Sequence, residues 1–465
     1  MTTIERAPVR VGKPAVAALG LLAAATGTLE SVVTPTLPLL QRELSMTPAQ
    51  GALLGITMLV TGALVTPIAG NLGDRYGGRR VMLRLMAVVV AGGLVSAAAP
   101  DLPVLLIGQI LQGAMVGAMP LSFILVRTYL PAGESQVAIG VVSGLFVGGG
   151  MLGTLIAGPL AEQLSRHWMF AVPTIAIAVA TLLVRMLLPD DPPARSDGAG
   201  IDWPGLVLLS GVLLTFMAGL AIAPEAAELP LPLVAVVVLL VVLVAAWIRV
   251  ERRSPAPMVD LALLAKPAIR SAYAITFAVC VGTAVATHLV PQLLAASAEG
   301  PGFGADSTDI GRYLLPGAVA AAASGPLGGA AARRFGGTAV VAAGVAVMTG
   351  ALIALAFVHS EIWHLVVAKA LIALASGVCV TAMVVRTATA VDRDATGTAT
   401  GLVLVTRVIG FAAGVQLSGA LLTAGTPAGT DDAAGSAYVT GFLVAGAVTA
   451  LSLFALRDLS KGAGK

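Results

Sequence analysis

Charged side chains are scarce in this sequence: only 11% of its 465 residues are Asp, Glu, Lys or Arg. An ordinary soluble domain carries about 25% charged residues. Hydrophobic residues instead make up 57% of the chain, and the mean hydropathy is +0.96. Together these values exclude a water-soluble fold and indicate an integral membrane protein.

Cysteine is almost absent as well. The two cysteines, Cys280 and Cys379, both lie within apolar stretches, where a thiol is typically a small, inert, buried side chain. They predict neither a disulfide nor a metal site. The chain has no phosphate-binding glycine loop, no cluster of metal ligands and no ATPase motif. We therefore expect no cofactor, no bound metal and no enzymatic activity, and an ion gradient as the source of any energy used.

The net charge is also small, +3, from 27 basic and 24 acidic residues. The basic residues are spread among the connections between apolar stretches and form no patch. The sequence therefore predicts no nucleic-acid-binding surface.

Apolar stretches of roughly 20 residues, the length that a helix needs to cross a bilayer, occur fourteen times. They lie at 14–38, 49–71, 81–100, 103–127, 136–161, 168–188, 203–223, 230–249, 270–296, 310–330, 338–358, 362–387, 397–423 and 437–456. The first is longer than a signal-peptide core and has no cleavage-like ending, so we interpret it as a retained span. If the N-terminus is cytoplasmic, most basic residues fall in or beside cytoplasmic connections. This pattern predicts fourteen crossings of the cell inner (plasma) membrane with both termini in the cytoplasm.

The connection Gly70–Arg80, between the second and third stretches, reads GNLGDRYGGRR and combines glycines with charges. Glycine accepts a positive φ without strain, which a very short turn between antiparallel helices requires. The arginines favour the cytoplasmic side of a membrane. Asp74 would lie beside helix ends and arginines, where a carboxylate accepts charge-assisted hydrogen bonds. A basic loop that only sets topology would explain the arginines, but neither Asp74 nor the glycine spacing.

This connection resembles the signature loop of the major facilitator superfamily at every fixed position but one, because Gly78 displaces the following arginine by one residue. Ile201–Gly205 resembles the entry to the extra helix pair in the fourteen-span drug/proton antiporter branch. The resemblance implies an all-α fold of two six-helix bundles plus an inserted helix pair. It also implies alternating access, with Asp74 in a contact between the bundles that breaks as the cavity opens inward. The gating loop that it assigns comprises Gly70, Gly73, Asp74, Arg75, Gly77, Arg79 and Arg80.

The second half of the chain repeats features of the first. Gly329–Gly337 aligns with the loop, and Val385–Thr387 aligns with Val126–Thr128. A parallel repeat of six-helix bundles is a transporter architecture, with the substrate bound between the halves near the midplane. Arg333 occupies the position of Asp74, so the acidic chemistry of the loop belongs to the first half only. The predicted domains are residues 1–190, residues 191–255 for the linker and inserted pair, and residues 256–465.

A charged side chain near the centre of a bilayer costs at least about 2.5–3.5 kcal/mol, so it usually faces a cavity or a partner. Glu30 is the only carboxylate well inside a predicted span. It is either a proton site or a structural ion pair, or it is solvated at an outer vestibule. Leu29 stands at the acidic position of the family, and one residue turns Glu30 by about 100° around the helix.

Four further polar groups are Lys369, His288, Gln109 and Gln112. By resemblance, their spans line the transport cavity, so they would face one cavity together with Glu30. Lys369 either pairs with Glu30 or an anionic substrate, or snorkels toward the outer interface. His288 is either a neutral core histidine or a proton relay. The glutamines hydrogen-bond neighbouring helices or contact substrate, and Gln109 replaces an arginine of the family.

Arg407 and three glycines complete the candidates. Arg407 lies mid-span and either packs between the bundles or contacts substrate. Gly149, Gly153 and Gly158 allow close helix approach and suit a sliding contact between the bundles. They keep the spacing of the family's antiporter signature, although its proline and one glycine are missing. The proton-coupling candidates are Glu30, Asp74 and His288.

These features predict a monomeric, proton-coupled secondary transporter that exports hydrophobic drugs or toxic compounds by alternating access. Its partners would be a small-molecule substrate, protons and the lipid bilayer. The alternative is a transporter of an anionic or lipid-like metabolite contacted by Lys369 and Arg407. A non-transporting receptor or scaffold is disfavoured, because buried charges and gate glycines would then be costly without a purpose.

Overall fold

The computed structural model describes residues 13–33, 36, 39–40, 43–46, 48–191, 202–222, 230–254, 267–297, 302–305, 307–392, 395–425 and 434–461. All regular structure within these ranges is helical. A bilayer imposes this choice, because no water is available in its core to satisfy backbone N–H and C=O groups, and a helix satisfies them internally.

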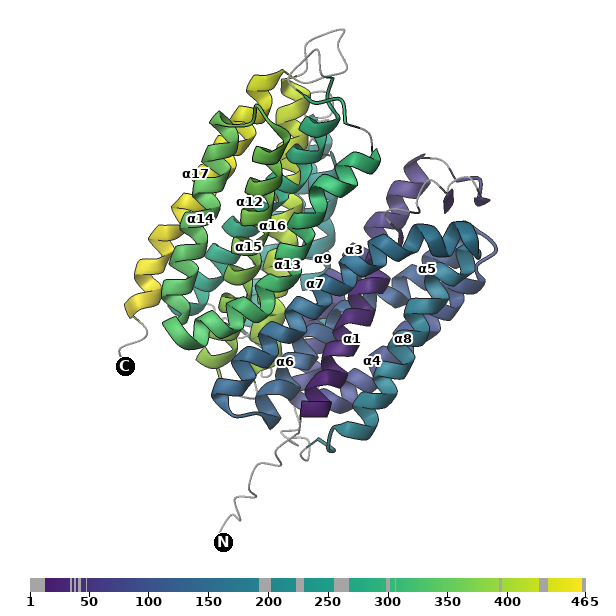
Figure 1. Ribbon diagram of the computed structural model, residues 1–465. Helices are drawn as coiled ribbons and strands as arrows, with labels where there is room; N and C mark the ends of the chain where they lie inside the picture. Colours follow the sequence, from purple (N-terminus) through teal and green to yellow (C-terminus); the bar gives the residue numbers. More distant parts are fainter. Residues whose placement is uncertain are drawn as a thin grey trace. The chain divides into compact units, whose positions relative to one another are not determined.

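The chain divides into two compact units (Figure 1). The first unit, Met1–Asp197 with Val391–Gly401, holds α1 (Lys13–Ser31), α3 (Pro48–Tyr76), α4 (Gly78–Ala98), α5 (Leu102–Gly113), the 3₁₀ turn η1 (Ala114–Gly117), α6 (Ala118–Tyr129), α7 (Ala132–Gln163) and α8 (Arg166–Leu187). The second unit, Gly198–Ala390 with Leu402–Lys465, holds α9 (Trp203–Ile222), α10 (Pro230–Glu251), α12 (Pro267–Ala295), α13 (Ser307–Phe335), α14 (Gly337–Phe357), α15 (Ile362–Ala390) and α17 (Gly435–Lys461). Helix α16 (Thr396–Ala424) begins in the first unit and belongs to the second from Leu402 onward.

A helix coincides with each of the fourteen predicted spans, and α5, η1 and α6 together make the fourth. In the described part of the chain, twelve segments are long and apolar enough to cross a membrane, and α3 and α9 occupy the other two predicted spans. The predicted all-α membrane fold is thereby confirmed. Helices α9 and α10 pack mainly against each other. Their separation as a segment of their own, 191–255, stays a prediction.

Within the first unit, α1 packs tightly on α7. The Thr28 hydroxyl donates to the Gly149 carbonyl oxygen across this contact, at 3.0 Å. A Cβ atom at Gly149 would overlap the Ala24 carbonyl oxygen, and one at Gly153 would overlap the Thr28 carbonyl oxygen. We expected these glycines at a contact between the bundles, whereas their close approach is to α1 of the same unit. Gly158 also lies in α7, and its surroundings fall outside the described residues.

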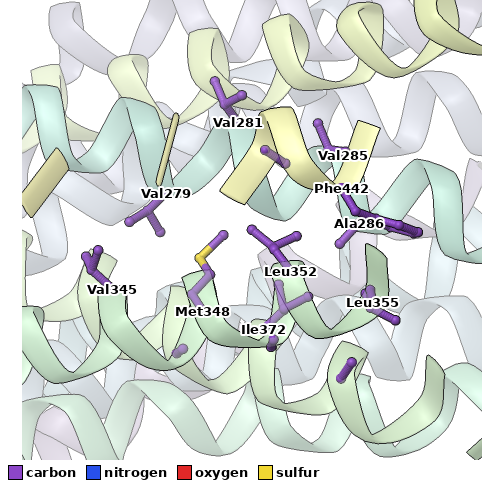
Figure 2. Packing of buried hydrophobic residues seen from close by; sticks show 14 of the residues in the cluster. Val279, Val281, Val285, Ala286, Val345, Met348, Leu352, Leu355, Ile372 and Phe442 are labelled. Atoms are coloured by element: carbon purple, nitrogen blue, oxygen red, sulfur yellow. The ribbon is translucent and has the colours of Figure 1, made fainter. Parts of the chain in front are cut away.

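The core of the second unit is formed by α12, α14, α15 and α17 (Figure 2). Along α14, Val345, Met348 and Leu352 are fully buried, at the spacing that gives a helix one apolar face. Val279 of α12 and Phe442 of α17 belong to the same cluster. This packing holds α12 and α15 together, and these two helices carry predicted site residues.

Helix α10 shows the opposite pattern, since apolar side chains such as Leu231, Val238 and Val241 are exposed. A helix that is apolar all round must be either buried in protein or surrounded by lipid. The exposed apolar surface of α10 therefore fits a membrane-spanning helix that faces lipid tails.

Candidate functional site

Asp74, near the end of α3, binds the first turn of α16 within the first unit. Its carboxylate accepts hydrogen bonds from the backbone N–H groups of Gly397 and Thr398, both at 2.8 Å, and from the Thr398 hydroxyl at 3.1 Å. The first N–H groups of a helix have no partner within the helix, and the helix dipole favours an anion there. Asp74 thus supplies the negative charge that this helix end lacks.

The glycines of the loop allow this approach. A Cβ atom at Gly70 would overlap the carbonyl group of Gly397, so α3 and α16 meet there through backbone alone. A Cβ atom at Gly73 would lie 2.5 Å from the Leu121 side chain of α6. Gly70 and Gly73 therefore serve helix contacts, whereas the predicted turn is made by Gly77.

Arg127, at the end of α6, binds the chain just after α15 and at the start of α16. Its guanidinium donates twice to the Val391 carbonyl oxygen, at 3.1 Å in each case, and once to the Thr396 hydroxyl at 2.5 Å. A cation thus lies at the carbonyl where α15 has just ended, and an anion at the amides where α16 begins. Arg127 was not among the predicted site residues, although its match with Arg386 in the repeat was an available signal.

Gly77 is the single residue between α3 and α4, with φ +98°. Beside it, the buried Asp191 carboxylate accepts hydrogen bonds from the N–H groups of Arg79 (3.0 Å) and Arg80 (2.7 Å). A Cβ atom at Gly77 would overlap the carboxyl group of Asp191. Glycine is needed here for its backbone conformation and for this space.

Arg79 extends the same contact. Its guanidinium pairs with the Asp190 carboxylate and donates to the Arg185 carbonyl oxygen at 2.7 Å. The residues after α8 were interpreted only as a linker, and nothing local in that stretch signalled that its acidic residues bind the loop. Asp190 and Asp191 are thus site residues that sequence reasoning missed.

The repeated loop of the second half has the same turn. Gly336 has φ +83°, and its N–H donates to Ala332 at 3.1 Å, as the Gly77 N–H donates to Gly73 at 3.0 Å. This confirms the internal repeat at the loop. Among the described residues, nothing lies within 4 Å of a Cβ atom at Gly336, so this part of the chain offers the second loop no carboxylate contact like that of the first.

Asp191→Ala is expected to destabilise the first unit by about 1–2 kcal/mol, because both N–H groups at the start of α4 lose their acceptor. The measurement is thermal unfolding of the purified protein. Asp101→Ala is the matched control: Asp101 caps α5 through one bond to the Val104 N–H at 3.0 Å, in an exposed position. If Asp101→Ala lowered stability as much as Asp191→Ala, the role assigned to the buried carboxylate would be wrong.

The other candidates of the first unit lie apart from the loop. Glu30 is half-buried on α1. Gln109 and Gln112 are fully buried: the Gln109 amide donates to the Gln112 side-chain oxygen (3.3 Å) and to the Ser96 hydroxyl (3.4 Å), and the Gln112 amide donates to the Gly92 carbonyl (3.3 Å). The glutamines thus join α5 to α4, and their contact with substrate stays a prediction.

In the second unit, Lys369 of α15 donates from Nζ to the Thr287 hydroxyl of α12 at 2.5 Å. His288 is the next residue of α12 and is half-buried. Arg407 lies one turn before Gly410, where α16 packs on the backbone of Phe277. Lys369 therefore lies beside the part of α12 that carries His288. Arg407 of α16 lies near a different part of α12, around Phe277. Pairing of Lys369 with Glu30 stays a prediction.

Among the described residues, no group of three or more His, Cys, Asp or Glu side chains could hold a metal ion. Cys280 and Cys379 are buried free thiols.

The family model described as Major Facilitator Superfamily matches residues 19–295, more than half of the chain. The chain belongs to the major facilitator superfamily. Members of this family are transporters and not enzymes, and the described helices make this facilitator a multi-pass membrane protein.

The relatives of this chain include drug-resistance proteins. A multidrug resistance protein B homolog of Mycobacterium tuberculosis is 30% identical over 220 residues, which are 45% of this chain and 39% of that protein. The tetracenomycin C resistance and export protein of Streptomyces glaucescens is 30% identical over 216 residues, 44% of this chain and 39% of that protein. The matched region spans less than half the length of either relative.

Solved structures share the fold over nearly the whole chain. The human organic anion transporter MFSD10 has a TM-score of 0.71 at 16% identity, covering 96% of this chain and 99% of that one. The E. coli fucose:proton symporter FucP has a TM-score of 0.63 at 14% identity, covering 95% and 97%. At these identities the likeness shows the fold alone.

Proposed function

We propose that this facilitator exports hydrophobic, drug-like compounds across the inner membrane in exchange for protons, by alternating access. Its family membership supports transport, and the names of its relatives support drug export. We further propose that both termini are cytoplasmic and that the working unit is a monomer.

The proposal rests on two oppositely charged side chains, Asp74 and Arg127, which bind backbone groups within Val391–Gly401. Asp74 holds the amides at the start of α16, and Arg127 holds the Val391 carbonyl. Alternating access requires polar contacts that form in one state and break in another. We assign this function to the two contacts, with Gly70–Arg80 as the loop that closes the cytoplasmic side.

Proton exchange is assigned to Glu30. It is a half-buried carboxylate on an apolar helix, and α1 is fixed against α7 by the Thr28–Gly149 bond. A carboxylate in such a place can hold a proton in one state and release it when a cationic or hydrophobic substrate arrives. His288 and Asp74 are the alternative proton sites.

Ethidium, a lipophilic cation, is expected to release protons when it is added to the purified parent protein in weakly buffered detergent solution. Glu30→Gln, which keeps the size of the side chain but cannot titrate, is expected to abolish this release. A pH-indicator dye or a glass electrode measures it directly.

Glu134→Gln is the matched control, because Glu134 lies exposed in the first turn of α7 and should leave the release unchanged. Release that persists in Glu30→Gln would transfer the proton site to His288 or Asp74. A folded parent that bound ethidium and released no proton would contradict proton exchange.

A further inference from the structure

A row of polar side chains crosses from α15 to α12 inside the second unit; we call Lys369, Thr287, Thr283 and Ser376 the polar row. Lys369 Nζ donates to the Thr287 hydroxyl at 2.5 Å. One turn earlier on α12, Thr283 Oγ1 lies 2.6 Å from Ser376 Oγ of α15. Two hydrogen bonds therefore link the same two helices, and only the one from Lys369 involves a charged group.

The hydroxyl protons of α12 are already engaged. Thr287 donates to the Thr283 carbonyl oxygen at 2.7 Å, and Thr283 donates to the Val279 carbonyl oxygen at 2.7 Å. Because a hydroxyl has one proton and an ammonium group has no acceptor, Thr287 accepts from Lys369 while it donates to the Thr283 carbonyl oxygen. Both hydroxyls are thereby oriented by their own helix.

The ammonium group of Lys369 has further hydrogen-bond donors. It carries three N–H donors, and Thr287 takes one of them. No carboxylate lies within ion-pair distance of Lys369 in the part of the chain that the structure describes. A charged group inside a span without a charged partner is costly, unless a ligand supplies the opposite charge.

The placement of Lys369 differs from that of a snorkelling lysine. Lys369 lies seven residues, or about 10 Å, into α15 from Ile362. Its stem packs against α13, where a Cβ atom at Gly317 would lie 3.3 Å from Lys369 Cγ. Its head is held sideways at Thr287, which is exposed. The stem is thus packed between helices, and the residue that accepts from the ammonium group is exposed.

We propose that Lys369 and Thr287 form an anion site for the carboxylate of an amphipathic compound, so that the substrates of this transporter include organic anions. The role of this site in transport rests on the proposed export function. Its test measures binding alone and does not depend on export. A carboxylate would accept charge-assisted hydrogen bonds from the two remaining ammonium donors.

The test compares two probes of nearly equal shape, 1-pyrenebutyrate and its methyl ester, by fluorescence titration of the purified protein in detergent. Binding to protein-free micelles is subtracted. We expect the parent to bind the carboxylate about tenfold more tightly than the ester, or better. Lys369→Gln should reduce this preference to none, and Lys369→Arg should retain part of it.

Thr287→Val should weaken the preference by a smaller factor, because the ammonium then loses the hydroxyl that positions it. Thr440→Val is the matched control: Thr440 is also exposed and donates to the carbonyl four residues earlier, at 2.7 Å, but it lies on α17 away from the polar row. It should leave both affinities unchanged.

Equal affinity of the parent for the two probes, or a preference that survives in Lys369→Gln, would overturn the anion site. If Lys369→Gln did not fold, Thr287→Val and Thr440→Val would decide the same question. Proton release with ethidium is measured separately. A parent that releases protons but shows no carboxylate preference loses only the anion site, and one with the preference but no proton release loses only the proposed exchange.

Discussion

Asp74→Asn is expected to lower transport in proteoliposomes about tenfold or more, with the protein still folded and inserted. The carboxylate now accepts from two amides and one hydroxyl of α16. An asparagine retains one acceptor oxygen and turns an NH₂ group toward the remaining donors. Hydrogen bonds to a charged group contribute about 1.5–3 kcal/mol each, which is enough to shift a two-state equilibrium by one or two powers of ten.

Hydrogen exchange would locate the effect. In Asp74→Asn the amides of Gly397 and Thr398 should exchange faster than in the parent, whereas α14 should not change. Asp309→Asn is the control, because Asp309 is a carboxylate at an exposed ion pair with Arg312. Normal transport by Asp74→Asn, together with faster exchange at α16, would separate this contact from the transport cycle and contradict its role as a gate.

Gly149→Ala is expected to destabilise the protein by about 1–3 kcal/mol, and Gly149→Val by more. The new Cβ atom would overlap the Ala24 carbonyl oxygen, which belongs to the backbone and cannot rotate away. Helices α1 and α7 would have to separate, and the Thr28–Gly149 hydrogen bond would lengthen. The measurement is the midpoint of thermal unfolding in detergent, together with the yield of folded protein.

Gly350→Ala provides the comparison. Gly350 lies within α14, and no described residue comes within 4 Å of a Cβ atom placed there. Alanine favours helix over glycine by about 0.8–1.0 kcal/mol, so this variant should be neutral or slightly more stable. Equal losses in both variants would mean that glycine is required for the flexibility of these helices rather than for the approach of α1 to α7.

Local composition was sufficient to predict the helices and one turn. Roughly twenty apolar residues make a span wherever they occur, because the thickness of the bilayer and the need to satisfy backbone hydrogen bonds leave no alternative. The turn at Gly77, and its repeat at Gly336, could be predicted for a similar reason, since the conformational freedom of glycine depends on no distant residue.

The partners of the charged groups were decided only by the tertiary structure. The sequence predicted that the Asp74 carboxylate accepts hydrogen bonds. Gly397, which donates one of them, is 323 residues away along the chain. Asp191 was not predicted as a site residue because it lies in a stretch interpreted as a linker. Arg127 was noted only as part of the internal repeat. Such contacts depend on how each helix is rotated about its axis and which helix lies beside it. A periodic pattern alone does not determine either of these.

For the glycines of α7 and the glutamines of α5, the sequence likewise predicted the kind of contact but not the partner helix. The glycine spacing predicted close helix packing, and the glutamines were predicted to hydrogen-bond neighbouring helices or to contact substrate. The close packing and the hydrogen bonds between helices occur. Which helix they meet, α1 for Gly149 and α4 for Gln112, followed from the packing of the whole first unit. The sequence by itself determined a helical membrane protein with a charged glycine loop. The tertiary structure alone decided which charges meet, because that choice is made by side-chain packing between segments far apart in the chain.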